Sequence, residues 1–394
     1  MRIGIDGGCL ANRRGFGRFA RQAMHALSRS GSAHEFVVLV DRPSSDLVSV
    51  PANFETVIVD VNEAPSQAAS AEGRRTVRDL LAMGRAASRA HLDLMYFPAS
   101  YSFFPVWNVG KVVVTLHDTL AVAHPELVFS NWKGRMAWAV KEHAAVRWAN
   151  QIVTVSQAAR SDLIAWFGLP PDRVSVVPEG PEDVFRPIAK DEACSTVLRK
   201  YGINPDRQFL LYVGGLSPHK NLPRLIEAFA LAAQGDTDLV LVGDTGDVFL
   251  THIPALREAV DRFGIAPHVN FTGFVPDTDL AYLYNSAYAL VHPSLMEGFG
   301  LPPVEAMACG TPVLSSNAGS LPEVVGDAGL FFDPTDVAAM AKTIKDLLDD
   351  PSKRDALAIK AMARSKLFTW PACASALLGV FDALDVSRAT GRAA

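Results

Sequence analysis

Short apolar runs rich in β-branched residues recur along the chain. Runs of this length and composition are typical of strands that are buried on both faces of a parallel sheet. In the first half the predicted strands are Ile3–Ile5, Phe36–Val40, Thr56–Val59, Val112–Leu116 and Ile152–Val155. In the second half they are Phe209–Val213, Leu239–Val242, Val269–Phe271, Ala289–Val291 and Pro312–Ser315.

Stretches with helical spacing of apolar residues lie between these runs, for example Leu222–Ala233 and Pro254–Phe263. Strands that alternate with helices predict an α/β fold. Because a chain of 394 residues is longer than one hydrophobic core usually organises, we predict two doubly wound, Rossmann-like domains. Ligands of such sheets bind at the carboxyl ends of the strands, so a shared site is expected in a cleft that both domains face.

The periodic pattern stops in the Pro- and acid-rich stretch Val177–Pro187, which we predict to be the hinge. The N-terminal domain is then 1–182 and the C-terminal domain 183–370. A second break at Phe368–Pro371 precedes a last helical segment. We predict that this segment, 371–394, crosses back onto the first domain.

The charge is distributed unevenly. Residues 1–180 hold 19 Lys+Arg and 16 Asp+Glu, whereas residues 181–394 hold 18 and 26. This balance is too weak for a nucleic-acid partner, but a mildly basic first half suits an anionic acceptor or an anionic lipid surface.

Cysteine spacing and the start of the chain indicate the compartment. Cys9, Cys194, Cys309 and Cys373 lie far apart and lack metal-ligand spacing, which predicts free thiols in a reducing compartment. The first residues enter a strand without a signal-peptide pattern, and no apolar run approaches the ~20 residues that span a bilayer. We therefore expect a cytoplasmic protein that is soluble or peripheral at the membrane.

The segment His292–Gly310, HPSLMEGFGLPPVEAMACG, carries the most chemistry. A strand end is followed by Glu297, a glycine-flanked turn and a helix that contains Glu305. The glycines allow the backbone to approach a ligand, and amides at the helix start favour an anion. The predicted ligand-binding residues of this segment are Glu297, Gly298, Phe299, Gly300, Leu301 and Glu305.

The two carboxylates have other interpretations. They could form the acid/base pair of a glycoside hydrolase, but Glu305 lies well along the helix, so we expect the two to hold different parts of one elongated ligand. Without the glycines, Glu297 would be a loop end and Glu305 a partner in an ordinary helix salt bridge.

A second segment, Leu211–Leu222, is a strand that leads through Gly214 and Gly215 to Lys220 at a helix start. A lysine there can reach diphosphate oxygens while nearby amides share the charge. The alternative is a solvent-exposed lysine.

Two N-terminal segments complete the candidates. In NRRGFGR, Gly15, Gly17 and Arg18 form a glycine-containing basic loop after the first strand, which is by itself a weak signal. In VVVTLHD, His117 and Asp118 follow a buried strand, where an open sheet places site residues. A structural hydrogen-bonded pair is the alternative for these two.

The spacing of Glu297 and Glu305 in EGFGLPPVE resembles the signature of the large retaining glycosyltransferase family four, glycosyl transferases group 1, which has the GT-B fold and includes many bacterial mannosyltransferases. The resemblance implies that Glu297 holds hydroxyls of the donor sugar and that Glu305 binds the nucleotide ribose. It extends through LHDTLAVAHPE and SLPEVVGDAGLFFDPTD and covers nearly the whole chain.

The segment that would contact the leaving nucleotide resembles the family only in part. Lys220 matches the lysine of the family's diphosphate-binding loop, but Gly215 stands where relatives often have an arginine. His219 or an arginine of the first domain is expected to supply the missing charge. In addition, Glu179 occupies a position where relatives commonly have asparagine.

The N-terminal candidates also resemble family positions. Gly15, Gly17 and Arg18 match the glycine-rich loop that approaches the donor diphosphate, and His117 matches the histidine near the sugar carbon and the acceptor. Catalytic roles are accordingly expected for His117, Glu297 and Lys220.

The resemblance implies transfer of a hexose from a nucleotide-sugar to a glycan or lipid-linked acceptor of a cell-surface polysaccharide. It favours mannose from GDP-mannose, with a UDP-sugar as the alternative. We expect retention of configuration by front-face attack, with no metal and no other cofactor, and we read Asp244–Asp247 as a loop. The rival functions are a GT-B-fold epimerase or phosphorylase and a non-catalytic sugar-nucleotide-binding subunit.

Two aromatic-basic stretches, Arg74–Arg89 and Trp132–Lys141, remain. We predict solvated amphipathic helices for both; the alternatives are an acceptor-lining face and a membrane-contacting surface.

Overall fold

The computed structural model describes residues 1–12, 15–62, 76–129, 131–189, 191–232, 235–243 and 253–391, with side-chain environments to Asp385. The chain divides into two compact units. Unit 1 comprises Met1–Glu179 and Thr369–Ala394, and unit 2 comprises Gly180–Phe368. The predicted domain boundaries, after residues 182 and 370, lie close to these crossings.

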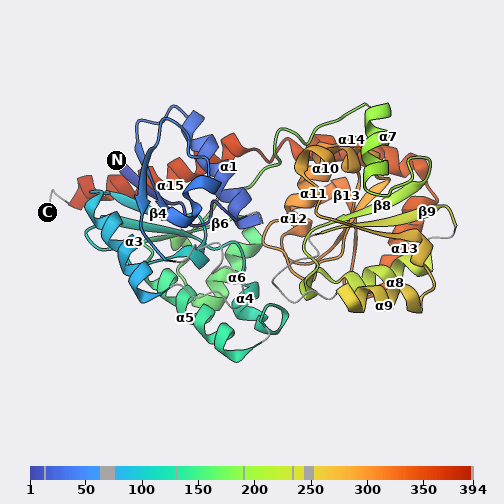
Figure 1. Cartoon of the computed structure of the whole chain (residues 1–394), viewed down its shortest axis with the longest axis horizontal. Helices are drawn as coiled ribbons and strands as arrows, with labels where there is room; N and C mark the ends of the chain where they lie inside the picture. The colour runs from blue at the N-terminus through green and yellow to red at the C-terminus, as the bar shows by residue number, and fades with distance from the viewer. Residues whose placement is uncertain are drawn as a thin grey trace. The chain divides into compact units, whose positions relative to one another are not determined.

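Unit 1 contains a parallel seven-stranded sheet in the order β3-β2-β1-β4-β5-β6-β7 (Figure 1). Five strands were predicted, whereas β4, whose four residues are all buried, and the three-residue β7 were missed. The strands are β1 Arg2–Asp6, β2 Glu35–Asp41, β3 Glu55–Val59, β4 Leu94–Phe97, β5 Lys111–Thr115, β6 Gln151–Thr154 and β7 Val174–Val176.

Unit 2 contains a parallel six-stranded sheet in the order β10-β9-β8-β11-β12-β13. The edge strand β13 was not predicted, and β12 begins one residue later than expected. The strands are β8 Gln208–Val213, β9 Thr237–Val242, β10 Val269–Gly273, β11 Ala289–His292, β12 Val313–Ser316 and β13 Gly329–Phe332.

Helices connect the strands, as the alternating pattern predicted. In unit 1 they are α1 Gly15–Arg29, α3 Val77–Arg89, α4 Leu120–Ala123, α5 Trp132–Trp148, α6 Gln157–Phe167 and α15 Trp370–Gly391. In unit 2 they are α7 Glu192–Lys200, α8 Leu222–Ala232, α9 Ile253–Arg262, α10 Asp277–Ser286, α11 Leu301–Ala308, α12 Leu321–Val325, α13 Val337–Leu348 and α14 Pro351–Ser365. Short 3-10 turns include η2 Ser100–Ser102 and η5 Pro218–Lys220.

Local sequence sets several helix ends. The side chain of Ser156 accepts from the amide of Ala159 at the start of α6, and Gly168 ends that helix in the left-handed conformation. Asn131 caps α5 in the same way by accepting from the amide of Gly134. These caps satisfy backbone groups that the helix itself leaves unpaired.

Each sheet reverses its strand order at one point, between β1 and β4 in unit 1 and between β8 and β11 in unit 2. Loops that leave neighbouring strands in opposite directions at such a point open a crevice at the carboxyl ends. The predicted site segments follow β1, β5, β8 and β11. The fold therefore brings candidate residues to the switch point of each sheet.

Helix α15 returns to unit 1 and packs against α1, beside which it is drawn in red in Figure 1. The Trp370 ring lies 6.2 Å from the Phe19 ring, and the Phe381 ring lies 5.5 Å from the Tyr96 ring. Cys373 and Leu377 are fully buried on the same helix. The C-terminal segment thus completes the core of unit 1.

Within the described part of the chain, one stretch, Pro351–Asp385, is long and apolar enough by length and composition to cross a membrane. We expected no stretch that is long and apolar enough to cross a membrane, and this stretch is an exception. The structure divides this stretch, because α14 ends at Ser365 and α15 begins at Trp370. On α15 the side chains of Trp370, Leu377 and Phe381 are buried in unit 1, whereas those of Leu378, Val380 and Leu384 are partly exposed.

Candidate functional site

In unit 2, three side chains surround the carboxylate of Glu297. They are Lys220, His292 and Ser294, and the four residues together are named the Glu297 cluster. Glu297 lies in the loop between β11 and α11, and Lys220 ends the turn η5 that follows β8. Since β8 and β11 are hydrogen-bonded neighbours, the two loops leave the sheet side by side. The structure thus brings together two of the predicted catalytic residues.

The cluster is tightly hydrogen-bonded. The Glu297 Oε1 atom lies 2.6 Å from Lys220 Nζ, 2.8 Å from His292 Nε2 and 2.7 Å from Ser294 Oγ. All three groups donate, because an ionised carboxylate only accepts. Burial by itself would raise the pKa of Glu297, but Lys220 and the hydrogen bond from His292 outweigh it and hold this pKa well below its usual range. The carboxylate is therefore ionised at neutral pH.

The backbone of Glu297 is fixed as well. Its carbonyl accepts from the amide of Ser320 at 3.2 Å and from Ser320 Oγ at 3.1 Å. Gly319 has a φ of 58°, and a Cβ at this residue would lie 2.6 Å from the Glu297 carbonyl oxygen. Only glycine fits this approach, so the loop at β12 clamps the loop of Glu297.

The predicted residues after Glu297 share the turn into α11. Gly300 is the N-cap with a φ of 103°, and a Cβ there would meet Leu321 at 2.9 Å. Phe299 and Leu301 are buried, and the Phe299 ring packs edge-on against Phe368. Their side chains serve packing, so a ligand could use only the backbone of this turn.

Glu305 lies farther along α11 and is almost completely buried. Its Oε2 accepts a hydrogen bond of 2.8 Å from the Tyr284 hydroxyl, and the Tyr284 ring packs edge-on against Phe185. A tyrosine of α10 therefore orients the second predicted carboxylate.

The predicted diphosphate loop begins at Gly214 and Gly215. Gly214 has a φ of 153°, and a Cβ there would lie 2.7 Å from the Tyr212 hydroxyl. That hydroxyl donates to the Gly215 carbonyl at 2.6 Å, while the Tyr212 ring stacks on His292. One buried tyrosine thus supports both this loop and the Glu297 cluster.

His219 does not replace the missing arginine in this structure. Burial, together with neighbouring Lys220, lowers the pKa of His219 to about 3, so the ring is uncharged at neutral pH. Its backbone carbonyl accepts from the amide of Leu295 at 2.8 Å, which joins the two loops. Lys220 is accordingly the cation of this cluster.

In unit 1, His117 follows β5 and is buried together with Glu179. Its Nδ1 lies 3.3 Å from Glu179 Oε1, and its Nε2 lies 3.1 Å from the Pro98 carbonyl oxygen. A carbonyl can only accept, so Nε2 carries a proton. The alternative partner Asp118 instead accepts from the amide of Leu120 at the start of α4.

The start of α1 covers His117. The rings of Phe16 and Phe19 lie 4.9 and 4.8 Å from the histidine ring. A Cβ at Gly17 would lie 1.9 Å from the Asn12 carbonyl oxygen, whereas Gly15 has open space around its Cα. Gly17 is thus required for packing and Gly15 is not.

The remaining N-terminal candidates are only partly placed. The prediction of a loop is wrong for Gly15, Gly17 and Arg18, because all three lie in the first turns of α1, where Arg18 is half-buried. Arg13 and Arg14 of the basic loop lie outside the described residues, as does the Asp244–Asp247 segment.

The residues that support Glu297 and His117 were not predicted from the sequence. His292 and Ser294 precede Glu297 in the motif itself, so their position at a strand end was an available signal. Glu179 was noted only as a departure from relatives, and Tyr212 carried no signal because it lies within a predicted strand.

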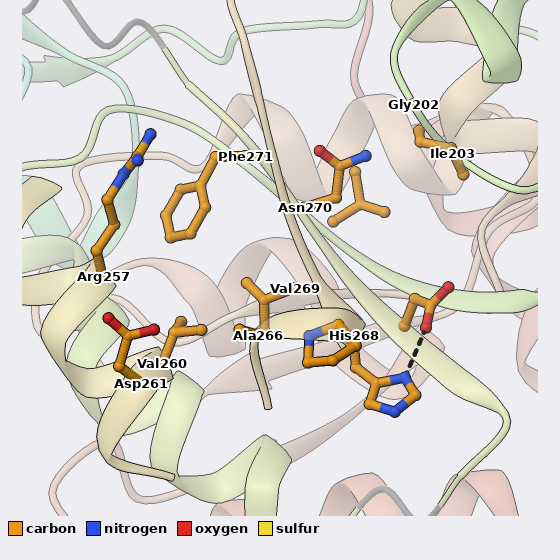
Figure 2. A pocket seen from close by; sticks show the side chains of 13 residues that line it. Gly202, Ile203, Arg257, Val260, Asp261, Ala266, His268, Val269, Asn270 and Phe271 are labelled. Carbon is orange, nitrogen blue, oxygen red and sulfur yellow. Dashed lines mark hydrogen bonds and ion pairs between the residues drawn. The ribbon is translucent and has the colours of Figure 1, made fainter. Parts of the chain in front are cut away.

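A separate hollow lies beside the edge strand β10 (Figure 2). Arg257, His268 and Asn270 line it, and none of the predicted site residues does. His268 binds Asp238 at 3.1 Å, and Asp238 also binds Arg207. The hollow lies toward the start of β10, away from the carboxyl ends where ligands of such sheets bind, so it is not the candidate site.

Known proteins resemble this chain in sequence and in fold. Residues 196–364 match the family model of glycosyl transferases group 1, and residues 13–182 match that of Glycosyltransferase Family 4. The O-antigen chain mannosyltransferase B of Escherichia coli is 35% identical over 76% of both chains. The serotype-specific mannosyltransferase WbdA of Escherichia coli is 33% identical over 68% of this chain, which spans one third of WbdA.

Among solved structures, the sucrose-phosphate synthase of Thermosynechococcus elongatus superposes with a TM-score of 0.76 at 21% identity and covers 98% of this chain and 100% of its own. The fold is therefore that of the GT-B glycosyltransferases, as predicted. The chain belongs to the glycosyl transferases group 1 family.

Proposed function

We propose that this glycosyltransferase transfers mannose from GDP-mannose to a glycan or lipid-linked acceptor in cell-surface polysaccharide synthesis. The Glu297 cluster carries the proposal, because it places an ionised carboxylate and a lysine at the switch point of the unit 2 sheet. The names of two Escherichia coli relatives support mannose and a surface polysaccharide.

Glu297 suits recognition of the donor sugar. Its Oε1 already takes three donors, which leaves the lone pairs of Oε2 for sugar hydroxyls. Because Lys220, His292 and Ser294 hold the carboxylate in place, little order is lost when the sugar binds. The backbone at Gly298–Gly300 would lie along the sugar and the phosphate.

Lys220 suits the leaving group. Its ammonium has three N–H groups, of which one points to Glu297, so the others can reach diphosphate oxygens. In the proposed step the bond between the anomeric carbon and the phosphate oxygen breaks, and the acceptor oxygen bonds to the same face of that carbon. The acceptor proton passes to the departing phosphate. Positive charge fixed at the phosphate stabilises this transition state without a metal.

Glu305 and unit 1 complete the assignment. Glu305, held by Tyr284, would bind the ribose, and the face that carries His117, Gly15 and Arg18 would receive the acceptor or complete the donor site. A lipid-linked acceptor implies work at the cytoplasmic face of a membrane, which agrees with the expected cytoplasmic or peripheral location.

Incubation of the purified protein with GDP- and UDP-sugars, without added metal, tests the proposal. We expect a rise in melting temperature and slow release of GDP with GDP-mannose. Lys220→Ala should lower the release rate by about 100-fold, since it removes the cation at the leaving group. Lys342→Ala removes a lysine whose side chain is 74% exposed, and it should change nothing.

The other outcomes identify the alternatives. Release of UDP from a UDP-sugar would replace the donor and keep the transferase. Isomerised sugar, or sugar phosphate made with free phosphate, would indicate an epimerase or a phosphorylase. Stabilisation without turnover, even with acceptor glycans, would favour a binding subunit. Determination of the anomeric configuration of the product by NMR tests retention.

A further inference from the structure

Helix α5 exposes a stripe of large apolar side chains. Trp132, Met136 and Val140 are 66%, 55% and 65% exposed. They are spaced every fourth residue and therefore lie on one face of the helix. This set is named the α5 stripe.

The inner face of α5 is apolar as well. Ala145 and Val146 are buried in the core of unit 1, and Trp138 packs against Phe129. The prediction of a solvated amphipathic helix for this segment is therefore wrong, because apolar residues occupy both faces. In the folded chain the core does not cover the stripe, and leaving three large apolar side chains in water is unfavourable.

Basic residues surround the stripe. Lys133 and Arg135 are exposed on its two sides, and Arg147 is exposed farther along the same face. The single acid of the helix, Glu142, is buried on the inner side. The nearest exposed acid along the chain is Glu126, which lies 3.4 Å from His124. The charge of the exposed face is thus positive.

We propose that the α5 stripe docks on an anionic lipid bilayer. An exposed indole at the helix start suits the headgroup boundary, and Met136 and Val140 would enter the acyl region below it. Lysine and arginine beside them bind anionic headgroups. The helix lies at the periphery of unit 1, outside the sheet, so it can lie flat on a surface (Figure 1).

The inference rests on the proposed function in one respect, because a lipid-linked acceptor would place the reaction at a membrane. The two proposals nevertheless fail separately. Nucleotide release in solution tests the transferase, whereas vesicle binding tests the stripe.

Flotation of the full-length protein with vesicles tests the proposal. The vesicles contain phosphatidylcholine alone or with about one third phosphatidylglycerol. We expect binding to the anionic vesicles that weakens with salt, because surface charges are screened. The triple variant Trp132→Ser, Met136→Ser, Val140→Ser should bind at least about tenfold more weakly at an unchanged melting temperature.

Two further variants isolate the cause. Leu231→Ser, Ile359→Ser, Leu367→Ser removes three apolar side chains of unit 2 that are 59%, 67% and 62% exposed, and it should bind like the wild type. Lys133→Glu, Arg135→Glu keeps the stripe and should abolish the preference for anionic lipid.

Equal binding by the wild type and the stripe variant would overturn the proposal, and so would an equal loss in the unit 2 control. Absence of binding to both vesicle types would also overturn it. Binding to neutral vesicles that charge reversal leaves unchanged would refute the role of anionic lipid.

Discussion

His117 is held at both ring nitrogens by groups of unit 1. Glu179 lies 3.3 Å from Nδ1, the Pro98 carbonyl lies 3.1 Å from Nε2, and the whole arrangement is buried. The ring therefore has a fixed orientation before any ligand binds.

Glu179→Ala should destabilise the protein by about 1–3 kcal/mol, because it leaves a buried ring nitrogen without its partner. Glu179→Gln keeps a side chain of the same length that can still form a hydrogen bond. It should therefore lower the free energy of unfolding by less than half as much as Glu179→Ala. Urea unfolding measures both values. Glu258→Ala, at an exposed site on α9, should change the free energy of unfolding by less than about 0.5 kcal/mol.

If Glu179→Ala were as stable as the wild type, the contact between His117 and Glu179 would not stabilise the fold. The 3.3 Å distance between His117 Nδ1 and Glu179 Oε1 would then not represent a stabilising hydrogen bond. Nucleotide release by the same variants then shows whether the orientation of His117 affects turnover.

The sequence predicted the residues with chemistry but not those that hold them. Glu297 and Lys220 could be found because motif spacing identifies each one locally. Their contact joins residues 77 positions apart, and that of His117 and Glu179 joins residues 62 apart. Such pairings follow from strand order, which local patterns do not encode.

At the scale of elements, α5 combines an apolar exposed face with a buried acid on its inner side. Glu142 is 5% exposed, its Oε1 lies 3.4 Å from Ser100 Oγ, and its Oε2 has no hydrogen-bond partner in the described structure. Burial raises the pKa of Glu142 from 4.5 to about 7.

This shift predicts a pH-dependent effect of Glu142→Gln. The unfolded chain loses the Glu142 proton near pH 4.5 and the folded chain near pH 7, so the free energy of unfolding of the wild type falls as the pH rises between these values. The variant lacks this fall. It should equal the wild type at about pH 4 and exceed it by roughly 3 kcal/mol at about pH 8.

Chemical denaturation at both pH values measures the difference. Glu126→Gln, whose carboxylate is 64% exposed, serves as the control and should show no such change. A Glu142→Gln advantage of the same size at both pH values would mean that packing, and not ionisation, causes it.

Strand length alone does not decide which strands were predicted. The four-residue strands β6, β11 and β12 were found, as were the longer strands β1, β2 and β8. The missed strands β4, β7 and β13 also have three or four residues, and β13 lies at a sheet edge with partly exposed side chains. Short strands gain their stability from neighbours already in the sheet, so the segment alone gives little signal.

At the scale of the molecule, the chain crosses between the units twice, after Glu179 and after Phe368. The first crossing lies next to the partner of His117. The second is followed by Trp370, whose ring packs on Phe19, and the Phe19 ring in turn packs on His117. Both crossings are therefore anchored to the His117 site of unit 1.

Two truncations test how far unit 1 depends on its last helix. Termination after Phe368 removes α15, on which Cys373, Leu377 and Phe381 are buried, and uncovers the side of α1 that packs against this helix. We expect unit 1 to lose its cooperative unfolding transition in calorimetry, since about 1.5–3 kcal/mol per large buried side chain is lost. Termination after Asp385 keeps these contacts and should unfold like the full chain.

Unit 2 contains the whole Glu297 cluster within 180–368, so the form that ends at Phe368 should still bind the nucleotide. Loss of nucleotide binding together with the unit 1 transition would show that the two units do not fold independently, whereas an unchanged unit 1 transition would show that α15 is dispensable for its core.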